Sequence, residues 1–354
     1  MARDAVTTDT SRIEPLAARD PVRVGVVGLG YWGPNLIRNL HEIPEAECAW
    51  MCDLRPNALS AVGRRYPAVR RTRYLDELLD DETLDAVAVV TPVGTHSDLA
   101  MRVLEAGKHV YVEKPLAASS ADARALIRAA YERRLVLMPG HTFLYSPPVI
   151  RIRDLIRSGE LGEIYFISMS RVNLGLHQSD VSVLWDLAPH DFSILLYWLD
   201  QAPVQIHGVA RSCILPGQED VAFINCQFES GTIAHVELSW LAPSKLRRTT
   251  VVGSEKMVVY DDCSNEPVRV YDSGVMPRNP ESFGEYLKYR AGDIVSPHIE
   301  GVEPLALEME DFCAAVRSGS SPRSSPQIGL GVVHMIEVAE RSLNQERAVS
   351  SVAG

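Results

Sequence analysis

The sequence has few cysteines, and none of them form a Cys-x-x-Cys pair. Because structural zinc sites usually draw their ligands from such pairs, we expect no metal centre in this protein. Isolated thiols are typical of proteins kept in a reducing compartment, which favours the cytoplasm. The six scattered cysteines are Cys48, Cys52, Cys213, Cys226, Cys263 and Cys313.

Long apolar runs and an excess of positive charge are also missing. No run approaches the roughly 20 apolar residues that a membrane helix needs. Residues Met1–Asp20 lack the apolar core of a signal peptide, and we expect them to form a disordered leader. The formal net charge is −11, which argues against nucleic acid and anionic membranes as partners, because both attract basic surfaces.

The length and the order of apolar segments predict two domains. A chain of 354 residues is too long for one ordinary core. In residues 21–145, short apolar runs alternate with helical patterns, which predicts a parallel sheet with right-handed crossovers. We therefore expect an α/β Rossmann domain there. Its expected strands are Val22–Gly30, Cys48–Asp53, Ala86–Thr91, His109–Val112 and Val136–Gly140.

Residues 146–354 show a different sequence pattern, in which longer strand-like segments are joined by short turns. This pattern predicts an α+β domain with a large, mostly antiparallel open sheet. An open sheet face of that size commonly binds a second copy, so we expect a homo-oligomer, either a dimer or a tetramer. We assign substrate binding and oligomerisation to this domain.

A glycine motif, Gly28-Leu-Gly30-Tyr-Trp-Gly33, follows the first expected strand and precedes a helical pattern. In that context glycines permit a tight turn and close approach of a pyrophosphate, whose charge faces the helix N-terminus. Asp53 lies 20 residues later at the end of the second strand, where a carboxylate accepts bonds from the ribose hydroxyls. This favours NAD over NADP. Arg55 could stack on adenine, reach a 2′-phosphate or be solvated.

With these motifs the chain resembles the Gfo/Idh/MocA family of oxidoreductases, from about Val22 to the last helical segments. The resemblance rests on Gly28–Gly33, on Thr91-Pro92 with His96, on Glu113-Lys114-Pro115, and on Asp186 with His190. It implies that Lys114 faces the substrate hydroxyl beside the nicotinamide, where an ammonium would stabilise developing negative charge. The expected cofactor-binding residues are Gly28, Gly30, Tyr31, Trp32, Gly33, Asp53, Arg55, Thr91, Pro92, His96, Glu113 and Lys114.

Asp186 and His190 are four residues apart, a spacing that places two side chains on one face of a helix. Proline is disfavoured in the interior of a helix, so residues Trp185–Pro189 could instead form a loop that leads into the helix. In either geometry the carboxylate can orient the imidazole, which suits a general base. Lys114, His190 and Asp186 are therefore the expected catalytic residues.

The segments 140–147, 171–175 and 185–191 are similar to family members that act on nucleotide-linked sugars, such as UDP-N-acetylglucosamine 3-dehydrogenases, their uronate counterparts and 3-ketoreductases. Leu144-Tyr145 departs from the Arg-Phe of many members. Lys245 and Arg247 form a basic pair that either faces a diphosphate or lies at an exposed strand end. The expected substrate-binding residues are Lys114, Tyr145, Arg171, Asn173, Trp185, Asp186, His190, Lys245 and Arg247.

We therefore expect an NAD-dependent oxidoreductase that acts at a ring hydroxyl, C3 in particular, of a nucleotide-linked hexose. The reverse reaction, by a 3-ketosugar reductase of deoxysugar or aminosugar biosynthesis, uses the same residues. An inositol-type polyol dehydrogenase and a dinucleotide-sensing regulator without catalysis are the alternatives. The residues leave open the exact sugar, the direction, the number of subunits and whether an oxo-acid recycles NADH in place.

Overall fold

The computed structural model describes residues 21–175, 181–277 and 287–346. The expected leader, residues 1–20, lies outside them. The chain divides into two compact units. Unit 1 contains the described residues up to Tyr145 together with Val302–Val333, although the sequence assigned everything after residue 145 to the second domain. Unit 2 contains the described residues of Ser146–Gly301 and those from His334 onward.

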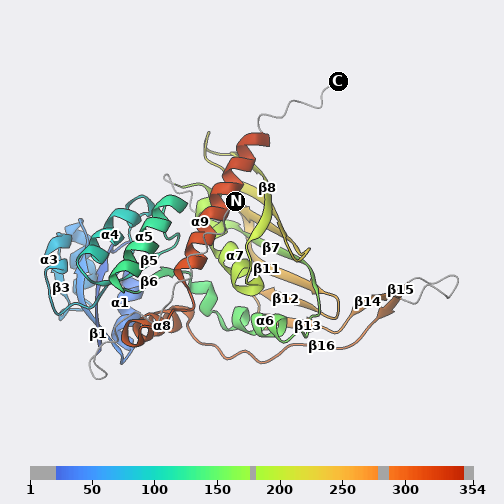
Figure 1. The fold of residues 1–354 in the computed structure, drawn as a ribbon, viewed down its shortest axis with the longest axis horizontal. Helices are drawn as coiled ribbons and strands as arrows, with labels where there is room; N and C mark the ends of the chain where they lie inside the picture. The colour runs from blue at the N-terminus through green and yellow to red at the C-terminus, as the bar shows by residue number, and fades with distance from the viewer. Residues whose placement is uncertain (1–20, 176–180, 278–286, 347–354) are drawn as a thin grey trace. The chain divides into compact units, whose positions relative to one another are not determined.

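Unit 1 is built on a six-stranded parallel sheet with the order β3-β2-β1-β4-β5-β6, which confirms the expected Rossmann architecture (Figure 1). The strand order reverses between β1 and β4, and in such sheets ligands bind beyond the carboxyl ends at this point. Valines of β1, β4 and β5 are fully buried, as their apolar runs predict. The strands are β1 (Val22–Val27), β2 (Ala46–Cys52), β3 (Arg70–Thr72), β4 (Ala86–Val89), β5 (His109–Glu113) and β6 (Leu137–Gly140).

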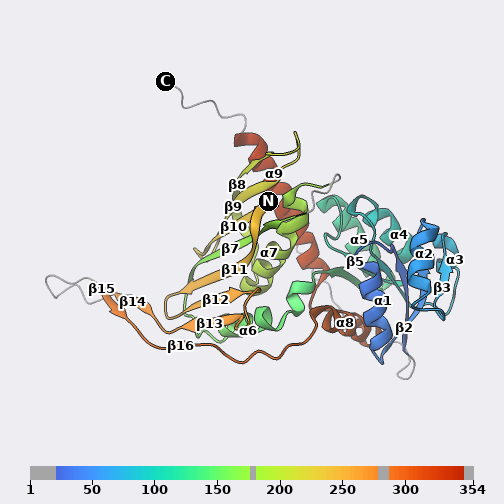
Figure 2. The ribbon, with the colours of Figure 1, turned by 180° about the vertical axis from the view of Figure 1, so that it is seen from behind.

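Helices cover the sheet of unit 1. Helix α4 packs beside α5, and α8 packs beside α1 (Figures 1 and 2). Arg38 of α1 forms an ion pair with Glu303, the residue directly before α8, and this pair links α8 to α1 within unit 1. The helical segments are α1 (Gly33–Glu42), α2 (Pro56–Gly63), α3 (Leu75–Leu79), η2 (Val93–Thr95), α4 (His96–Glu105), α5 (Ser120–Arg133), η3 (Thr142–Tyr145) and α8 (Pro304–Ser318).

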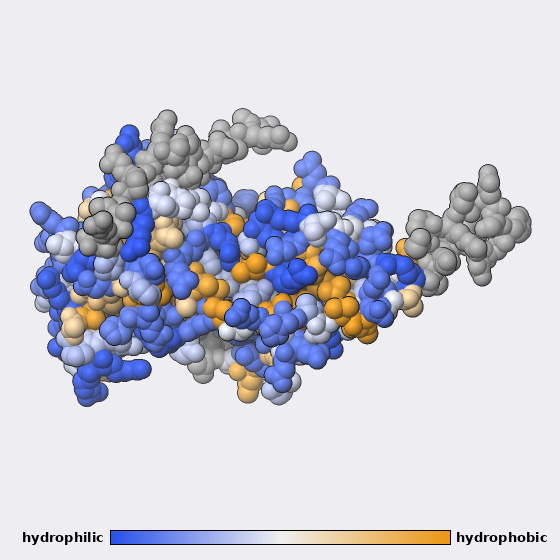
Figure 3. Space-filling model, turned by 90° about the horizontal axis from the view of Figure 1, so that it is seen from below, coloured by the Kyte–Doolittle hydropathy of each residue, from blue (hydrophilic) through white to orange (hydrophobic). Residues whose placement is uncertain are grey.

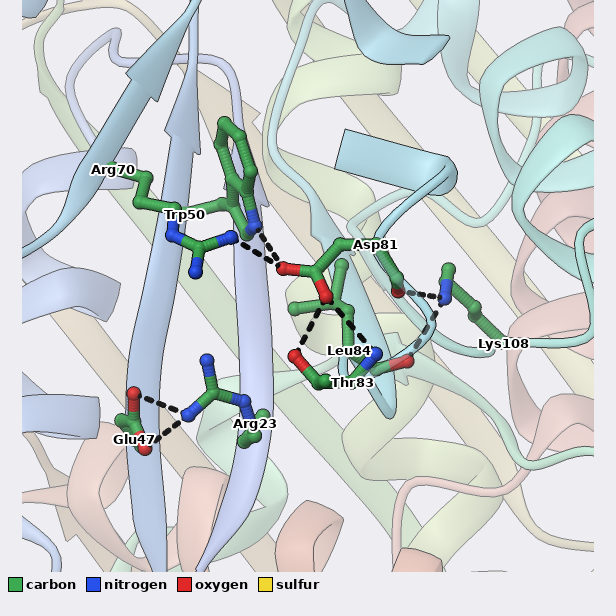
Figure 4. Close-up of polar contacts among 8 residues, drawn as sticks. All are labelled: Arg23, Glu47, Trp50, Arg70, Asp81, Thr83, Leu84 and Lys108. Atoms are coloured by element: carbon green, nitrogen blue, oxygen red, sulfur yellow. Dashed lines mark hydrogen bonds and ion pairs between the residues drawn. The ribbon is translucent and has the colours of Figure 1, made fainter. Parts of the chain in front are cut away.

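A polar cluster lies at the amino-terminal ends of β3, β4 and β5, where it also contacts Trp50 of β2 (Figure 4). The Asp81 carboxylate accepts hydrogen bonds from Trp50, Arg70 and Thr83. These bonds, first that of the Thr83 hydroxyl and then that of the Trp50 indole, lower the pKa of Asp81 to about 2. The Lys108 ammonium donates to the backbone carbonyls of Asp81 and Leu84, at 2.8 and 3.0 Å. This end of the sheet lies opposite the expected ligand edge, so we interpret the cluster as structural.

Unit 2 contains an eight-stranded sheet with the order β16-β13-β12-β11-β7-β10-β9-β8, together with the β14–β15 pair. Among the described strands, β7 and β10 pair in parallel and the others antiparallel, which confirms the mostly antiparallel sheet. The strands are β7 (Ile164–Leu174), β8 (Pro203–Arg211), β9 (Val221–Phe228), β10 (Ile233–Ser239), β11 (Leu241–Gly253), β12 (Met257–Asp261), β13 (Val268–Tyr271), β14 (Gly274–Pro277), β15 (Leu287–Arg290) and β16 (Ile294–Val295).

One face of this sheet is covered by helix α7 (Val183–Leu199), which packs on β9 and β10 (Figure 2). Strand β9 alternates buried and exposed residues, so that Ile224 points to the core and Phe223 to the opposite face. Helix α6 (Pro147–Arg157) contacts α7. Helix α9 (Pro326–Glu346) begins in unit 1 and ends in unit 2.

The helix α7 is continuous through Pro189, so the alternative of a loop over Trp185–Pro189 is wrong. Proline lacks an N–H and therefore gives up one hydrogen bond within the helix. The helix offsets this loss by burial, since Phe192 and Trp198 are in the core and the Trp198 indole donates to the Val149 carbonyl at 2.9 Å.

Candidate functional site

The glycine loop connects β1 to α1, as the motif predicts. Gly28 has a φ of +98°, and a Cβ there would lie 2.5 Å from the Val90 carbonyl oxygen, so only glycine fits this turn. A Cβ on Gly33 would overlap the Gly28 carbonyl oxygen. Around Gly30 a Cβ would meet no atom within 4 Å, so the loop backbone is open on that side and fits an approaching pyrophosphate.

The two aromatic residues of the loop, Tyr31 and Trp32, are exposed and contact each other edge to face at 5.3 Å between ring centroids. Trp32 is the last residue before α1. The side chains of both are therefore accessible to a ligand at the loop.

Asp53 lies directly after β2 and is held by its neighbours. Its Oδ2 accepts from the Leu29 N–H of the glycine loop at 2.7 Å, and Arg55 donates to both carboxylate oxygens at 2.8 to 3.0 Å. Burial by itself would raise the pKa of Asp53, but the bonds from Arg55 and Leu29 lower it overall. The Arg55 side chain is 60% exposed and lies on Asp53 rather than free in solvent. The carboxylate is therefore ionised and fixed beside the loop.

His96 joins two of the expected cofactor-binding segments. Its Nε2 lies 2.7 Å from the Thr91 carbonyl oxygen after β4, and its Nδ1 lies 2.8 Å from the Pro115 carbonyl oxygen after β5. Pro92 separates Thr91 from η2. Burial lowers the pKa of His96, although the two carbonyls oppose this. The ring thus ties together the ends of two neighbouring strands.

Glu113 is the last residue of β5, and Lys114 follows it. Burial raises the pKa of Glu113 to about 7, against the opposing effect of the Lys114 ammonium. Burial and the same ammonium lower the pKa of His141 to about 3. His141 is fully buried, and its ring nitrogens have no hydrogen-bond partner among the described residues. Lys114 therefore lies among buried titratable side chains. Of these, the sequence motifs include Glu113 and His96 but not His141.

Strands β1, β4 and β5 are neighbours and run parallel, so their carboxyl ends share one edge. The structure thus brings together the glycine loop, the segment from Thr91 to His96, and Glu113 with Lys114 at one edge of unit 1. This edge is the ligand edge of an open parallel sheet.

Tyr145 is not available to a substrate. Its side chain is 1% exposed, and its hydroxyl donates to Asp311 of α8 at 2.6 Å and accepts from the Ser324 N–H at 3.1 Å. The structure therefore places it in the core of unit 1, and we leave it out of the proposed substrate site. Only the long-range contact with α8 reveals this role, and the sequence gives no local sign of it.

In unit 2, Asp186 and His190 lie one turn apart on α7, which confirms the helical alternative for this pair. The Trp240 indole donates to Asp186 Oδ2 at 3.1 Å and fixes the carboxylate from the end of β10. Trp185 precedes Asp186, and its indole donates to Glu340 of α9 at 2.6 Å. Trp240 and Glu340 were not anticipated, because both contacts join residues distant in sequence.

The remaining expected substrate residues are more scattered. Arg171 of β7 is buried and forms a fork with the Asp191 carboxylate at 2.8 and 2.9 Å, so it binds the middle of α7. Asn173 is half-buried two residues further along β7, and Lys245 is exposed on β11. Arg247 forms an ion pair with Asp262 at 3.2 Å.

No group of three or more His, Cys, Asp or Glu side chains among the described residues is arranged to hold a metal ion. No helix in the same ranges is long and apolar enough to cross a membrane. All six cysteines carry free thiols, and burial raises the pKa of Cys48 to about 12.

Comparison with known proteins identifies two family domains in the chain. Residues 22–141 match the oxidoreductase family with an NAD-binding Rossmann fold, and residues 149–259 match the GFO/IDH/MocA C-terminal domain. Residues 22–141 therefore form an NAD-binding Rossmann domain, and the open glycine loop with the ionised Asp53 fits that cofactor.

Similar proteins include dehydrogenases of different substrates. Inositol 2-dehydrogenase of Rhizobium meliloti (strain 1021) is 25% identical to this protein, and the similarity covers 93% of this chain and 99% of the relative's chain. UDP-N-acetylglucosamine 3-dehydrogenase of Acidithiobacillus ferrooxidans is 26% identical, over 83% of this chain and 92% of its own. The crystal structure of GenD2 from gentamicin A biosynthesis, in complex with NAD, superposes with a TM-score of 0.79 at 27% identity, over 94% of this chain and 97% of that one.

Proposed function

Because this chain belongs to the Gfo/Idh/MocA family of oxidoreductases, we propose that it oxidises the C3 hydroxyl of a hexose that is linked to a nucleoside diphosphate. The broader activity, NAD-dependent oxidoreduction at a CH–OH group, follows from the family. The observation that carries the proposal is the position of Lys114, at the same sheet edge as the glycine loop and Asp53.

Bound NAD supplies the hydride acceptor. The amides at the start of α1 and the open backbone at Gly30 hold its pyrophosphate. Asp53 accepts hydrogen bonds from the adenosine ribose, a role that its lowered pKa supports because only the ionised form accepts with both oxygens. Arg55 neutralises part of this charge and shields it from solvent.

The catalytic residues have two roles, which are to remove the proton of the substrate hydroxyl and to stabilise the charge on its oxygen. His190 takes the proton from the substrate hydroxyl, and Asp186, held by Trp240, stabilises the imidazolium that forms. The Lys114 ammonium binds the same oxygen while negative charge develops on it. These assignments rest on the family resemblance and on the i, i+4 placement of Asp186 and His190 in α7.

The nucleotide-linked sugar is favoured by the similarity to UDP-N-acetylglucosamine 3-dehydrogenase and by the segments 140–147 and 171–191. In this proposal Trp185 and Asn173 contact the sugar, and Lys245 with Arg247 contacts the diphosphate. Arg171 supports α7 through Asp191 instead of binding substrate. A polyol of the inositol type is the second candidate substrate, because this chain is similar to inositol 2-dehydrogenase over 99% of that enzyme's length. Reduction of a 3-ketosugar is the same chemistry reversed.

We further propose that two copies of the chain associate through the uncovered face of the unit 2 sheet. Phe166, Phe223 and Ile233 are exposed on neighbouring strands of that sheet. Figure 3 shows, for one face of the molecule, exposed hydrophobic residues among hydrophilic ones. Apolar side chains gathered in this way are typical of subunit interfaces.

The free thiols support a location in the reducing cytoplasm.

A thermal-shift screen tests the substrate class. We expect UDP-N-acetylglucosamine, its uronate or another nucleoside diphosphate hexose to raise the melting temperature in the presence of NAD, since a ligand of the native state stabilises by mass action. A Lys245→Ala, Arg247→Ala double variant should lose part of that shift but keep the shift from NAD alone. Stabilisation by myo-inositol and by no nucleotide sugar would instead support the polyol candidate.

A further inference from the structure

The parallel pair of strands in unit 2 ends in two polar side chains. Strands β7 and β10 run in the same direction, so their carboxyl ends share one edge of the sheet. Alternate residues along both strands are buried, as on the covered face of a sheet. These residues are Ile167, Met169 and Arg171 on β7, and Ala234, Val236, Leu238 and Trp240 on β10 and just beyond it. Only the last member of each series, Arg171 or Trp240, carries a nitrogen donor in its side chain.

Both donors bind carboxylates of helix α7. The Arg171 guanidinium donates to both oxygens of Asp191, at 2.8 and 2.9 Å, and the two side chains are 6% and 3% exposed. The indole of Trp240, a residue that is 1% exposed, donates to Asp186 Oδ2 at 3.1 Å. Hydrogen bonds to a charged group are stronger than neutral ones, and a fork also fixes direction. Helix α7 is therefore held to the ends of two neighbouring strands.

The two contacts flank His190 around the helix axis. At about 100° per residue, His190 lies about 40° from Asp186 and about 100° from Asp191, between the two. Pro189 has no N–H and removes one backbone hydrogen bond from the same part of α7. One contact would leave the helix free to turn about it, whereas two contacts on different sides fix its rotation. They therefore fix the direction in which the His190 side chain leaves the helix.

The Trp240 ring is itself fixed by the chain around it. Its backbone N–H donates to the Asp220 carbonyl at 3.0 Å, and its carbonyl accepts from the Gly175 N–H at 2.9 Å. A Cβ on Gly175 would lie 2.6 Å from the indole Cδ1, so a side chain there would displace the ring. Glycine at this position gives the indole the space it needs. The indole N–H is therefore presented to Asp186 from a fixed support.

We propose that Arg171 and Trp240 are positioning residues for His190, which hold α7 on both sides of the imidazole from the carboxyl edge of the parallel pair. The inference rests on the proposed role of His190 as the general base. Arg171 and Trp240 are too buried to contact substrate, and they act through Asp191 and Asp186. Their loss should therefore slow the chemical step more than it weakens binding.

Turnover of three variants tests this separation. Trp240→Phe keeps an aromatic ring but removes the donor, and Arg171→Lys keeps the buried charge but cannot form the fork. Each should lower kcat about tenfold and leave KM within about twofold, because a misplaced catalytic group slows the chemical step. The matched control Trp198→Phe removes another indole donor of α7, far from His190, and should keep the wild-type kcat. Wild-type kcat in either test variant, or an equal loss in the control, would overturn the proposal.

A double-mutant cycle separates positioning from a general effect on folding. If Trp240 acts through Asp186, then Trp240→Phe should cause almost no further loss of kcat in an Asp186→Ala background, where the acceptor is already absent. An effect of Trp240 that is independent of Asp186 would make the two losses multiply. Multiplied losses would therefore contradict the scheme.

Crystal structures of the whole protein test the positioning without any substrate. In Trp240→Phe and in Arg171→Lys, the His190 imidazole should be displaced relative to β7 and β10 by about 1 Å, a shift large enough to impair catalysis. In Trp198→Phe it should stay in its wild-type place. An imidazole that stays in place in both test variants would overturn the inference. If it moves as expected but wild type oxidises no sugar, the proposed function fails while the positioning of His190 stands.

Discussion

Replacement of Asp53 by serine should change the choice between NAD and NADP. The Asp53 carboxylate is ionised, accepts the Leu29 N–H at 2.7 Å and is only partly neutralised by Arg55. In wild type it would repel the 2′-phosphate of NADP. Serine removes this charge and releases the Arg55 guanidinium, which can then bind the 2′-phosphate.

The size of the effect follows from the charges. A 2′-phosphate about 5 Å from the carboxylate would be repelled by about 3 kcal/mol per unit charge at an effective dielectric constant of ~20. Arg55 offsets part of this energy, so we expect wild type to prefer NAD by about 10²-fold, since 1.4 kcal/mol is a tenfold change. Asp53→Ser should reduce the preference to about tenfold or less and weaken NAD binding by roughly tenfold through the lost bonds.

Fluorescence titration with NADH and NADPH measures both affinities. Asp80→Ser, which changes an exposed aspartate outside the cofactor edge, is the matched control and should keep the wild-type preference. In the Asp53→Ser background, Arg55→Ala should remove the gained NADPH affinity. Equal or tighter binding of NADPH by wild type would refute the reasoning and make Arg55 the partner of the 2′-phosphate.

Three further predictions concern catalysis and stability. Lys114→Met should lower the rate of hydride transfer in stopped-flow NADH measurements by about 10²–10⁴-fold, with NAD affinity retained; near-normal turnover would exclude its assigned role. Asp81→Asn should cost about 1–2 kcal/mol at pH 7 in urea unfolding. Because folding lowers the pKa of Asp81 from 3.8 to about 2, this difference should disappear as the pH falls through that range. Tyr145→Phe should destabilise by about 1–3 kcal/mol through loss of the Asp311 bond, with KM unchanged.

Local patterns were sufficient to predict most of unit 1. Its buried strands are continuous apolar runs, and the glycine loop with Asp53 is a short motif whose context could be checked within the sequence itself. Strand β3 was missed because its three residues are Arg70, Arg71 and Thr72, which carry no apolar pattern. Helix α2 was missed for a related reason, since it begins at Pro56 and ends at Gly63, two residues that usually mark turns.

Contacts between distant segments could not be predicted in this way. The return of α8 to unit 1 places Asp311 on Tyr145 and Glu308 beside Thr142, across 166 residues in each case. No periodicity or motif encodes such a pairing in a single sequence. The same holds for the fork between Arg171 and Asp191, which shows why an arginine that resembles a substrate ligand can serve to hold a helix.

Turnover on a panel of substrates tests the central claim most directly. Enzyme and NAD are mixed with UDP-N-acetylglucosamine, its uronate, dTDP-glucose, free glucose and myo-inositol, and NADH absorbance is followed with and without an oxo-acid acceptor. We predict NADH formation with at least one nucleotide sugar, none with free glucose, and loss of the signal in Lys114→Met. Clear turnover of myo-inositol or free glucose, with none on any nucleotide sugar, would contradict the proposed substrate class.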